Sequence, residues 1–197
     1  IDPSNLVFLI DVSGSMRQGL SLIQKSLNLL VDELSKKDKI SIVVYAGSAG
    51  EVLPATSVNE KQKIKEAINN LKSGGSTAGG EGINLAYKIA KQNFIPKGNN
   101  RIILCTDGDF NVGISSKDEL TELIEEKRKQ KIFLSVCGFG YAQHKDSEME
   151  AIADKGNGNY YYIDGEAEAK KVFVTQMRST LFTIAKDMKI QMVFNED

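Results

Sequence analysis

The sequence has no marked charge imbalance and no long apolar run. Its 197 residues include 25 Lys and Arg against 26 Asp and Glu, so the formal net charge at pH 7 is −1. Binding a nucleic-acid backbone requires a clustered basic excess, and the composition does not favour that class of partner. No apolar run approaches the roughly 20 residues that cross a bilayer. No targeting segment is recognisable, and the composition is that of a globular domain.

Histidine and cysteine, two residue types common in catalytic sites, are also scarce. His144 is the single histidine, and it lies in a polar stretch that we expect to be exposed, so a Ser-His-Asp triad is not favoured. The two cysteines, Cys105 and Cys137, lie near the ends of apolar runs without CxxC spacing. We expect two buried thiols, which give no information on the redox compartment. The glycine-rich stretch 74–82 lacks the GxxxxGK[ST] pattern that cradles phosphate.

Strand-like and helix-like segments alternate along the chain. Runs rich in Val, Ile, Phe or Tyr are typical of buried parallel strands, and they occur at Leu6–Ile10, Ile40–Tyr45, Arg101–Cys105, Ile132–Cys137 and Tyr160–Ile163. A further strand, Glu51–Leu53, follows a predicted turn at 46–50. Because that turn is too short for a parallel crossover, this strand is expected to run antiparallel at a sheet edge.

The segments between the strands have helical patterns. We predict helices over Leu20–Leu34, Asn59–Leu71, Gly82–Phe94, Ser116–Gln130, Asp146–Lys155 and Glu166–Ala185. Ser116 is a candidate cap for its helix. The alternation predicts an α/β fold of the doubly wound, Rossmann-like kind, with a mostly parallel central sheet, one antiparallel edge strand and helices on both faces. We expect one domain over 1–186 and a strand-like tail over 187–197 that leads into a further region. The abrupt start at Ile1 suggests an excised domain.

Oxygen-bearing side chains follow the predicted strands. The first strand runs into an Asp-x-Ser-x-Ser motif, whose alternate spacing lets Asp11, Ser13 and Ser15 converge. Asp107 follows a later strand, and Thr77 lies in a glycine-rich loop before a helix. In open α/β sheets, ligands bind outside the carboxyl ends of the strands. Such oxygen ligands suit a hard cation such as Mg²⁺. The alternative is that Ser13 and Ser15 cap the following helix and Asp107 caps a turn.

Because all five of these positions are filled, the sequence resembles the von Willebrand factor type A family. The resemblance covers nearly the whole chain. The resemblance implies a metal-ion-dependent adhesion site that holds a divalent cation, Mg²⁺ first, with Mn²⁺ or Ca²⁺ as alternatives. The stretches 74–87, 105–113 and 156–164 resemble a bacterial envelope subfamily. That likeness implies a location in the cell envelope or outside the cell, with the cytoplasm as the alternative.

The resemblance further implies a protein-binding module that is not an enzyme, in which an acidic side chain of a partner completes the metal shell. Glu81, Asp109 and Asn111 are expected on the rim, where they either shape partner choice or form a solvated loop edge. Sliding of the last helix, 166–185, would accompany ligand binding, as in relatives. Two other functions stay open: a metal-dependent phosphatase or hydrolase at the same strand ends, and an intracellular adaptor to an ATPase complex.

Overall fold

The sheet has the predicted mixed character. The computed structural model describes residues 2–46, 48–74, 80–108, 117–140 and 146–177. Within them one sheet has the strand order β3-β2-β1-β4-β5-β6. The strands are β1 (Ser4–Asp11), β2 (Lys39–Ala46), β3 (Ser48–Ser57), β4 (Asn99–Thr106), β5 (Ile132–Phe139) and β6 (Tyr160–Ile163). Among the strands that the structure describes, only the edge pair β2–β3 is antiparallel, which confirms the prediction.

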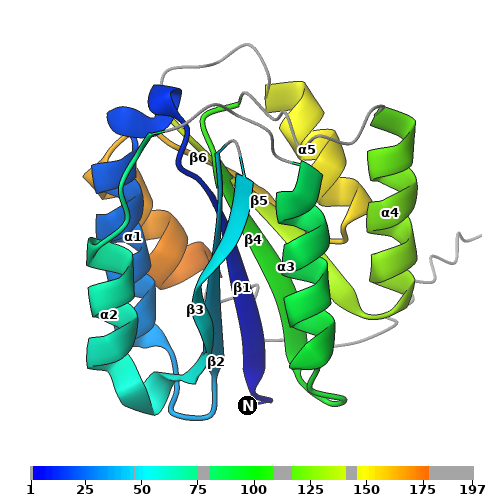
Figure 1. Ribbon diagram of the computed structural model, residues 1–197, viewed down its shortest axis with the longest axis horizontal. Helices are drawn as coiled ribbons and strands as arrows, with labels where there is room; N and C mark the ends of the chain where they lie inside the picture. The colour runs from blue at the N-terminus through cyan, green and yellow to red at the C-terminus, as the bar shows by residue number, and fades with distance from the viewer. Residues whose placement is uncertain (1, 47, 75–79, 109–116, 141–145, 178–197) are drawn as a thin grey trace, which may run out of the picture.

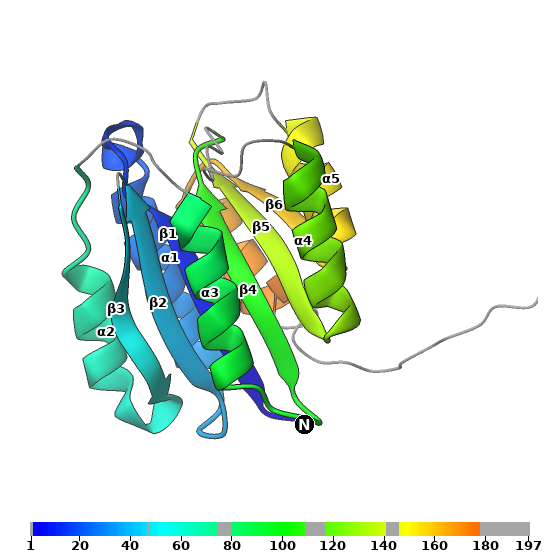
Figure 2. The same cartoon turned by 45° about the vertical axis from the view of Figure 1, so that its right-hand side comes forward.

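Helices cover both faces of this sheet (Figure 1). One face carries α1 and α2 together with α6 and its π-helical continuation η3, and Figure 2 shows α3 and α4 on the opposite face, where α5 also packs. Their bounds are α1 (Leu20–Glu33), α2 (Lys61–Asn69), α3 (Gly80–Gln92), α4 (Lys117–Lys129), α5 (Asp146–Lys155), α6 (Glu166–Lys170) and η3 (Lys171–Gln176). Two short 3₁₀ turns are η1 (Gly14–Arg17) and η2 (Val58–Glu60).

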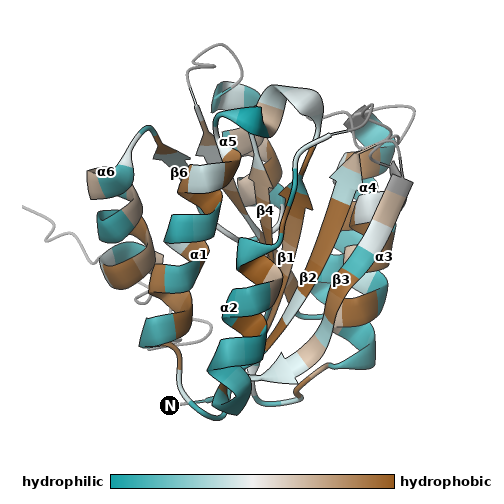
Figure 3. Cartoon of the chain, turned by 60° about the vertical axis from the view of Figure 1, so that its left-hand side comes forward, coloured by the Kyte–Doolittle hydropathy of each residue, from teal (hydrophilic) through white to brown (hydrophobic). Residues whose placement is uncertain are grey.

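The sheet separates two hydrophobic cores. Side chains alternate along a strand, so neighbouring residues enter opposite layers. Phe8 belongs to the core under α1, α2 and α6, whereas Val7 belongs to the core under α3, α4 and α5. Strand β1 is buried along its whole length because helices cover both of its faces. Figure 3 shows hydrophilic residues on the outer sides of α1 and α2, which is the pattern of amphipathic surface helices.

The edge strand and two helix starts differ from the predictions. The chain reverses within the predicted turn at 46–50, but more tightly than predicted, because Ser48, Ala49 and Gly50 already pair with β2 and extend β3 well beyond Glu51–Leu53. These small residues carry little strand propensity of their own, and the neighbouring strand supplies the hydrogen bonds. The helix expected from Asn59 begins as the turn η2 and becomes α-helical at Lys61, and α3 begins two residues early, at Gly80.

Several predictions fall outside the described residues. These are the Ser116 cap, the last helix beyond 177 and the tail 187–197. The division into 1–186 and 187–197 therefore stays a prediction. No helix in the described ranges is long and apolar enough to cross a membrane. Cys105 and Cys137 are buried, free and opposite each other on β4 and β5, which confirms the expectation of two buried thiols.

Candidate metal site

The candidate site lies at the upper edge of the sheet in Figure 1, where β1 and β4 end side by side. Strand β1 lies between β2 and β4, so the direction in which successive strands are added to the sheet reverses at β1. Open α/β sheets bind ligands at the point where the strand order reverses. Asp11 is the last residue of β1, and Asp107 directly follows the last residue of β4. Two carboxylates almost a hundred residues apart in sequence therefore end neighbouring strands.

The Asp-x-Ser-x-Ser segment brings its three side chains together. The backbone N–H of Ser13 donates to Oδ1 of Asp11 at 2.8 Å, and the hydroxyl oxygens of Ser13 and Ser15 lie 3.0 Å apart. Asp11 is fully buried, whereas Ser15 is exposed. Ser13 precedes the turn η1, but its side chain forms no capping hydrogen bond there. Helix capping therefore does not explain the Ser13 hydroxyl.

The charge of Asp11 is poorly compensated. Burial raises the pKa of Asp11 most, the hydrogen bonds from Ser13 lower it, and the charge of Asp107 raises it again, with a net rise. No Lys or Arg of the described residues forms an ion pair with Asp11, and none contributes to this shift. A buried carboxylate without a cationic partner is costly. A divalent cation at this point would compensate both carboxylates.

The remaining predicted ligands and rim residues are only partly placed. Thr77, Asp109 and Asn111 lie outside the described residues, as does His144, and Glu81 lies in the first turn of α3 without a described side chain. The loop that carries Thr77 nevertheless begins and ends beside β1. The Gly74 N–H donates to the Val12 carbonyl at 2.9 Å. At the other end, a Cβ on Gly82 would lie 3.3 Å from the Leu9 side chain.

Thr106 is a contributor that the sequence analysis missed. Its Oγ1 donates to Oδ2 of Asp11 at 3.5 Å and accepts from the N–H of Gly108 at 3.3 Å. Gly108 has a φ of +106°, a region that favours glycine. The signal was available, because Thr106 directly precedes Asp107 and must end the same strand.

The donor set favours a hard cation that keeps some of its water. The described residues contain no group of three or more His, Cys, Asp or Glu side chains able to hold a metal ion. A cation here would therefore depend on serine hydroxyls and water beside the carboxylates. Mg²⁺ accepts oxygen ligands of this kind and usually retains several waters, so the residues present fit it.

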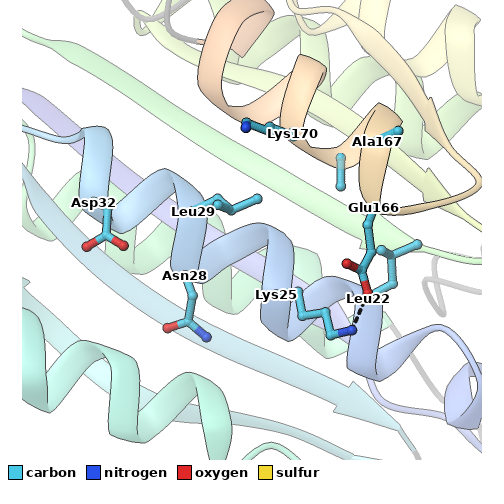
Figure 4. A pocket seen from close by; sticks show the side chains of 9 residues that line it. Leu22, Lys25, Asn28, Leu29, Asp32, Glu166, Ala167 and Lys170 are labelled. Atoms are coloured by element: carbon cyan, nitrogen blue, oxygen red, sulfur yellow. Dashed lines mark hydrogen bonds and ion pairs between the residues drawn. The ribbon is translucent and has the colours of Figure 1, made fainter.

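A separate hollow lies between α1 and α6. It has a volume of about 530 Å³, and its walls include Leu22, Leu29 and Ala167. The ion pair between Lys25 and Glu166 joins the two helices at one end of it (Figure 4). None of the residues that line this hollow is a predicted ligand of the candidate metal site.

Comparison with known families identifies this architecture. The family described as the von Willebrand factor type A domain matches residues 5–176. The chain belongs to this family. As a von Willebrand factor type A domain, it is 50% identical over 194 residues to the uncharacterized protein YfbK of Escherichia coli K12. That alignment covers 98% of this chain but 34% of YfbK, so the chain spans about a third of that relative's length.

Two solved structures share the fold, and the first of them is named as a von Willebrand factor type A protein. One from Catenulispora acidiphila superposes with a TM-score of 0.75 at 22% identity, covering 91% of this chain and 43% of that one. An aerotolerance-related membrane protein from Bacteroides fragilis superposes with a TM-score of 0.63 at 21% identity, covering 89% of this chain and 98% of that one. At these identities the likeness shows the fold alone.

Proposed function

We propose that this von Willebrand factor type A domain is a metal-dependent protein-binding module. Asp11, Ser13, Ser15, Thr77 and Asp107 would hold the cation, Mg²⁺ first and Mn²⁺ or Ca²⁺ as alternatives. The observation that carries the proposal is the pair of serine hydroxyls 3.0 Å apart beside a buried aspartate with no Lys or Arg partner among the described residues.

Each residue has a separate part in this proposal. Asp11 supplies charge from a fixed position, because the Ser13 N–H holds one of its oxygens. The hydroxyls of Ser13 and Ser15 supply neutral oxygens, so they add ligands without cancelling the charge of the cation. When bound, the cation acts as an electrophile for an acidic side chain. If one of the two aspartates binds through a water, the cation is left electrophilic and attracts an acidic side chain of a partner. Glu81, Asp109 and Asn111 would select among partners.

The first experiment measures Mg²⁺ binding by isothermal titration calorimetry. We expect the wild-type domain to bind Mg²⁺, and both Ser13→Ala and Ser15→Ala to weaken binding by about 10-fold or more, because each removes an oxygen ligand. Ser21→Ala is the matched control, since Ser21 is an exposed serine on α1. Absence of heat from Mg²⁺, Mn²⁺ and Ca²⁺ alike would overturn the metal site.

The second experiment tests recognition of acidic groups. The domain is applied to an array of peptides that contain Asp or Glu, each beside a matched peptide with Asn or Gln. We expect binding that requires Mg²⁺, disappears with chelator and is lost in the amide peptides. Binding that is unchanged by chelator would contradict the proposal. Turnover in a panel of phosphate esters and carboxylic esters would instead favour the metal-dependent hydrolase.

We propose a location in the cell envelope or outside the cell. The resemblance of the stretches 74–87, 105–113 and 156–164 to a bacterial envelope subfamily supports this proposal. The test is fractionation of cells that produce the full-length protein, and recovery in the cytoplasmic fraction would favour the adaptor function instead.

A further inference from the structure

An exposed arginine lies on the same turn as a proposed metal ligand. The turn η1, which lies between β1 and α1 at the upper edge of Figure 1, contains Ser15 and ends at Arg17. Met16 between them is fully buried, whereas Ser15 and Arg17 are exposed. Consecutive residues of a 3₁₀ turn rise by about 2 Å each, so Arg17 lies about 4 Å beyond Ser15 along the axis of the turn. Arg17 therefore belongs to the surface around the proposed ligands.

The turn also determines the side on which the Arg17 side chain stands. In a 3₁₀ helix the side chains of residues i and i+3 eclipse each other. Arg17 therefore projects on the same side as Gly14, the glycine between the two serines of the motif. A Cβ on Gly14 would meet no described atom within 4 Å. The side of the turn that Arg17 shares with Gly14 is open to a partner.

Arg17 takes part in none of the ion pairs within the described part of the chain. Those pairs join other residues, among them Lys25 with Glu166 and Lys65 with Asp32. A guanidinium carries five donors in a planar fork, and the fork matches the two oxygens of a carboxylate. On the open side of η1 this fork is available to an acidic group of another molecule.

The charges of the site give such a cation a use. A divalent cation beside Asp11 and Asp107 forms a cluster without net charge, because the two carboxylates balance it. Once an acidic side chain of a partner occupies the open coordination position, the cluster is negative and repels further acidic groups. Arg17 adds a positive charge next to this cluster. It can therefore hold a second carboxylate that the cation itself cannot hold.

We propose that Arg17 is a second anchor for the partner, which binds a carboxylate beside the one on the cation, so that the preferred partner segment carries two acidic side chains. This inference rests on the proposed function. In an extended segment alternate side chains lie on the same face, about 7 Å apart. An Asp or Glu pair at positions i and i+2 is therefore the expected recognition element.

The experiment measures the affinities of three peptides in Mg²⁺ by fluorescence anisotropy. The peptides share flanking Gly-Ser residues, and their centres read Glu-Ser-Glu, Glu-Ser-Gln and Gln-Ser-Glu. We expect the wild-type domain to bind the doubly acidic peptide about 5-fold more tightly than either singly acidic one, as an exposed ion pair in good geometry allows. Because the pair is exposed, this preference should shrink as NaCl is raised from about 0.05 M to about 0.5 M.

Variants of Arg17 test whether its charge is the cause. Arg17→Gln should reduce the preference to about 2-fold, which two equivalent registers of the peptide give without a second contact. Arg17→Lys keeps the charge without the fork and should retain part of the preference. Lys36→Gln is the matched control, because Lys36 is an exposed cation in the turn between α1 and β2, at the opposite end of the sheet. It should keep the wild-type preference.

The outcomes separate this inference from the proposed function. A preference of the wild type no greater than that of Arg17→Gln would overturn the inference and leave the metal site with its single carboxylate standing. Weaker Mg²⁺ binding by Arg17→Gln in calorimetry would show that the arginine supports the turn itself, and would also overturn the inference. Absence of Mg²⁺-dependent binding by all three peptides would overturn both this inference and the proposed recognition of acidic groups.

Discussion

At the scale of single residues, the molecule keeps a charge where an apolar group would be more stable. Asp11 continues the alternation of β1 into the layer occupied by Val7 and Leu9, and it is as buried as they are. Because its pKa is raised in the folded state, the ionised form is penalised above that pKa, and the penalty is absent below the pKa of the unfolded chain. Neutral solution therefore contains the less stable form of the metal-free domain.

Asp11→Asn tests this conflict between stability and binding. The amide keeps the size of the side chain and an oxygen for the Ser13 N–H. In the presence of chelator we expect its melting temperature to exceed that of wild type by about 2–4 °C, which corresponds to about 1 kcal/mol in a domain of this size. Added Mg²⁺ should raise the melting temperature of wild type and leave that of Asp11→Asn unchanged.

Asp38→Asn is the control for Asp11→Asn. Asp38 is another buried aspartate, but its carboxylate accepts the N–H groups of Ser4 and Ser35 at 2.7 Å each, so its role is structural. We expect this variant to melt earlier and to respond to Mg²⁺ as wild type does. A lower melting temperature in metal-free Asp11→Asn would contradict the charge argument.

The sequence was informative about residues that carry a motif and uninformative about which residues of other strands lie opposite it. Asp11, Ser13 and Ser15 could be grouped because alternate spacing at a strand end has a direct geometric meaning. Tyr45 could not, because it comes from another strand, and its position opposite Asp11 depends on the parallel register between β1 and β2. Short-range patterns do not contain that register.

At the scale of elements, α2 is held at its end by a side chain of α1. The Nε2 of Gln24 donates to the carbonyls of Ile68, Asn69 and Leu71 at 3.1, 3.1 and 3.2 Å. The last carbonyls of a helix lack partners within the helix, and this amide supplies one. The chain then passes to Gly74, which is bonded to the end of β1. Gln24 therefore fixes the start of the loop that carries Thr77.

Gln24→Ala is expected to lower the free energy of unfolding by about 1–2 kcal/mol, because one donor serves several carbonyls. Denaturant unfolding measures this change. The control is Gln62→Ala on α2, whose exposed side chain donates to exposed Glu66 and should matter by less than about 0.5 kcal/mol. Equal effects of the two changes would show that the capping by Gln24 contributes nothing.

The turn between α5 and β6 requires a glycine for lack of space. A Cβ on Gly158 would lie 1.9 Å from the carbonyl oxygen of Leu134, whereas one on Gly165 would meet nothing within 4 Å. Gly158→Ala must therefore move the turn that follows α5 away from β5. We expect a loss of about 1–3 kcal/mol or more, measured by denaturant unfolding. Gly165→Ala should change stability by less than about 0.5 kcal/mol, and a similar loss there would refute the steric explanation.

Elements were predictable where burial dominates and less so at edges. The strands β1, β4 and β5 are apolar because both faces are covered, and their existence follows from that pattern, whereas their order in the sheet does not. The strand β3 is different, since its first residues are small and its pairing with β2 is irregular near Ile42. The π-helical segment η3 was not foreseen either, because its residues Lys171–Gln176 show an ordinary helical composition.

At the scale of the whole molecule, topology assembles the site. Asp11 and Asp107 meet because β4 crosses over to lie beside β1, and the loop that begins at Gly74 returns to the same edge. Each contributor comes from a different part of the chain, so a ligand that binds there joins segments that only the folded state brings together. Such a ligand binds the native state and not the unfolded chain, and this difference must appear as stability.

Metal binding should therefore stabilise the entire domain. Mg²⁺ at about 100 times its dissociation constant adds about 2.7 kcal/mol to the free energy of unfolding, which corresponds to a rise in melting temperature of about 5–11 °C for a chain of this length. Thermal unfolding is followed with Mg²⁺, with chelator, and with NaCl at matched ionic strength. The rise should grow with the logarithm of the Mg²⁺ concentration, reverse with chelator and be absent in Ser13→Ala. A rise that NaCl reproduces would reflect screening of exposed charges and would count against a site at the ends of β1 and β4.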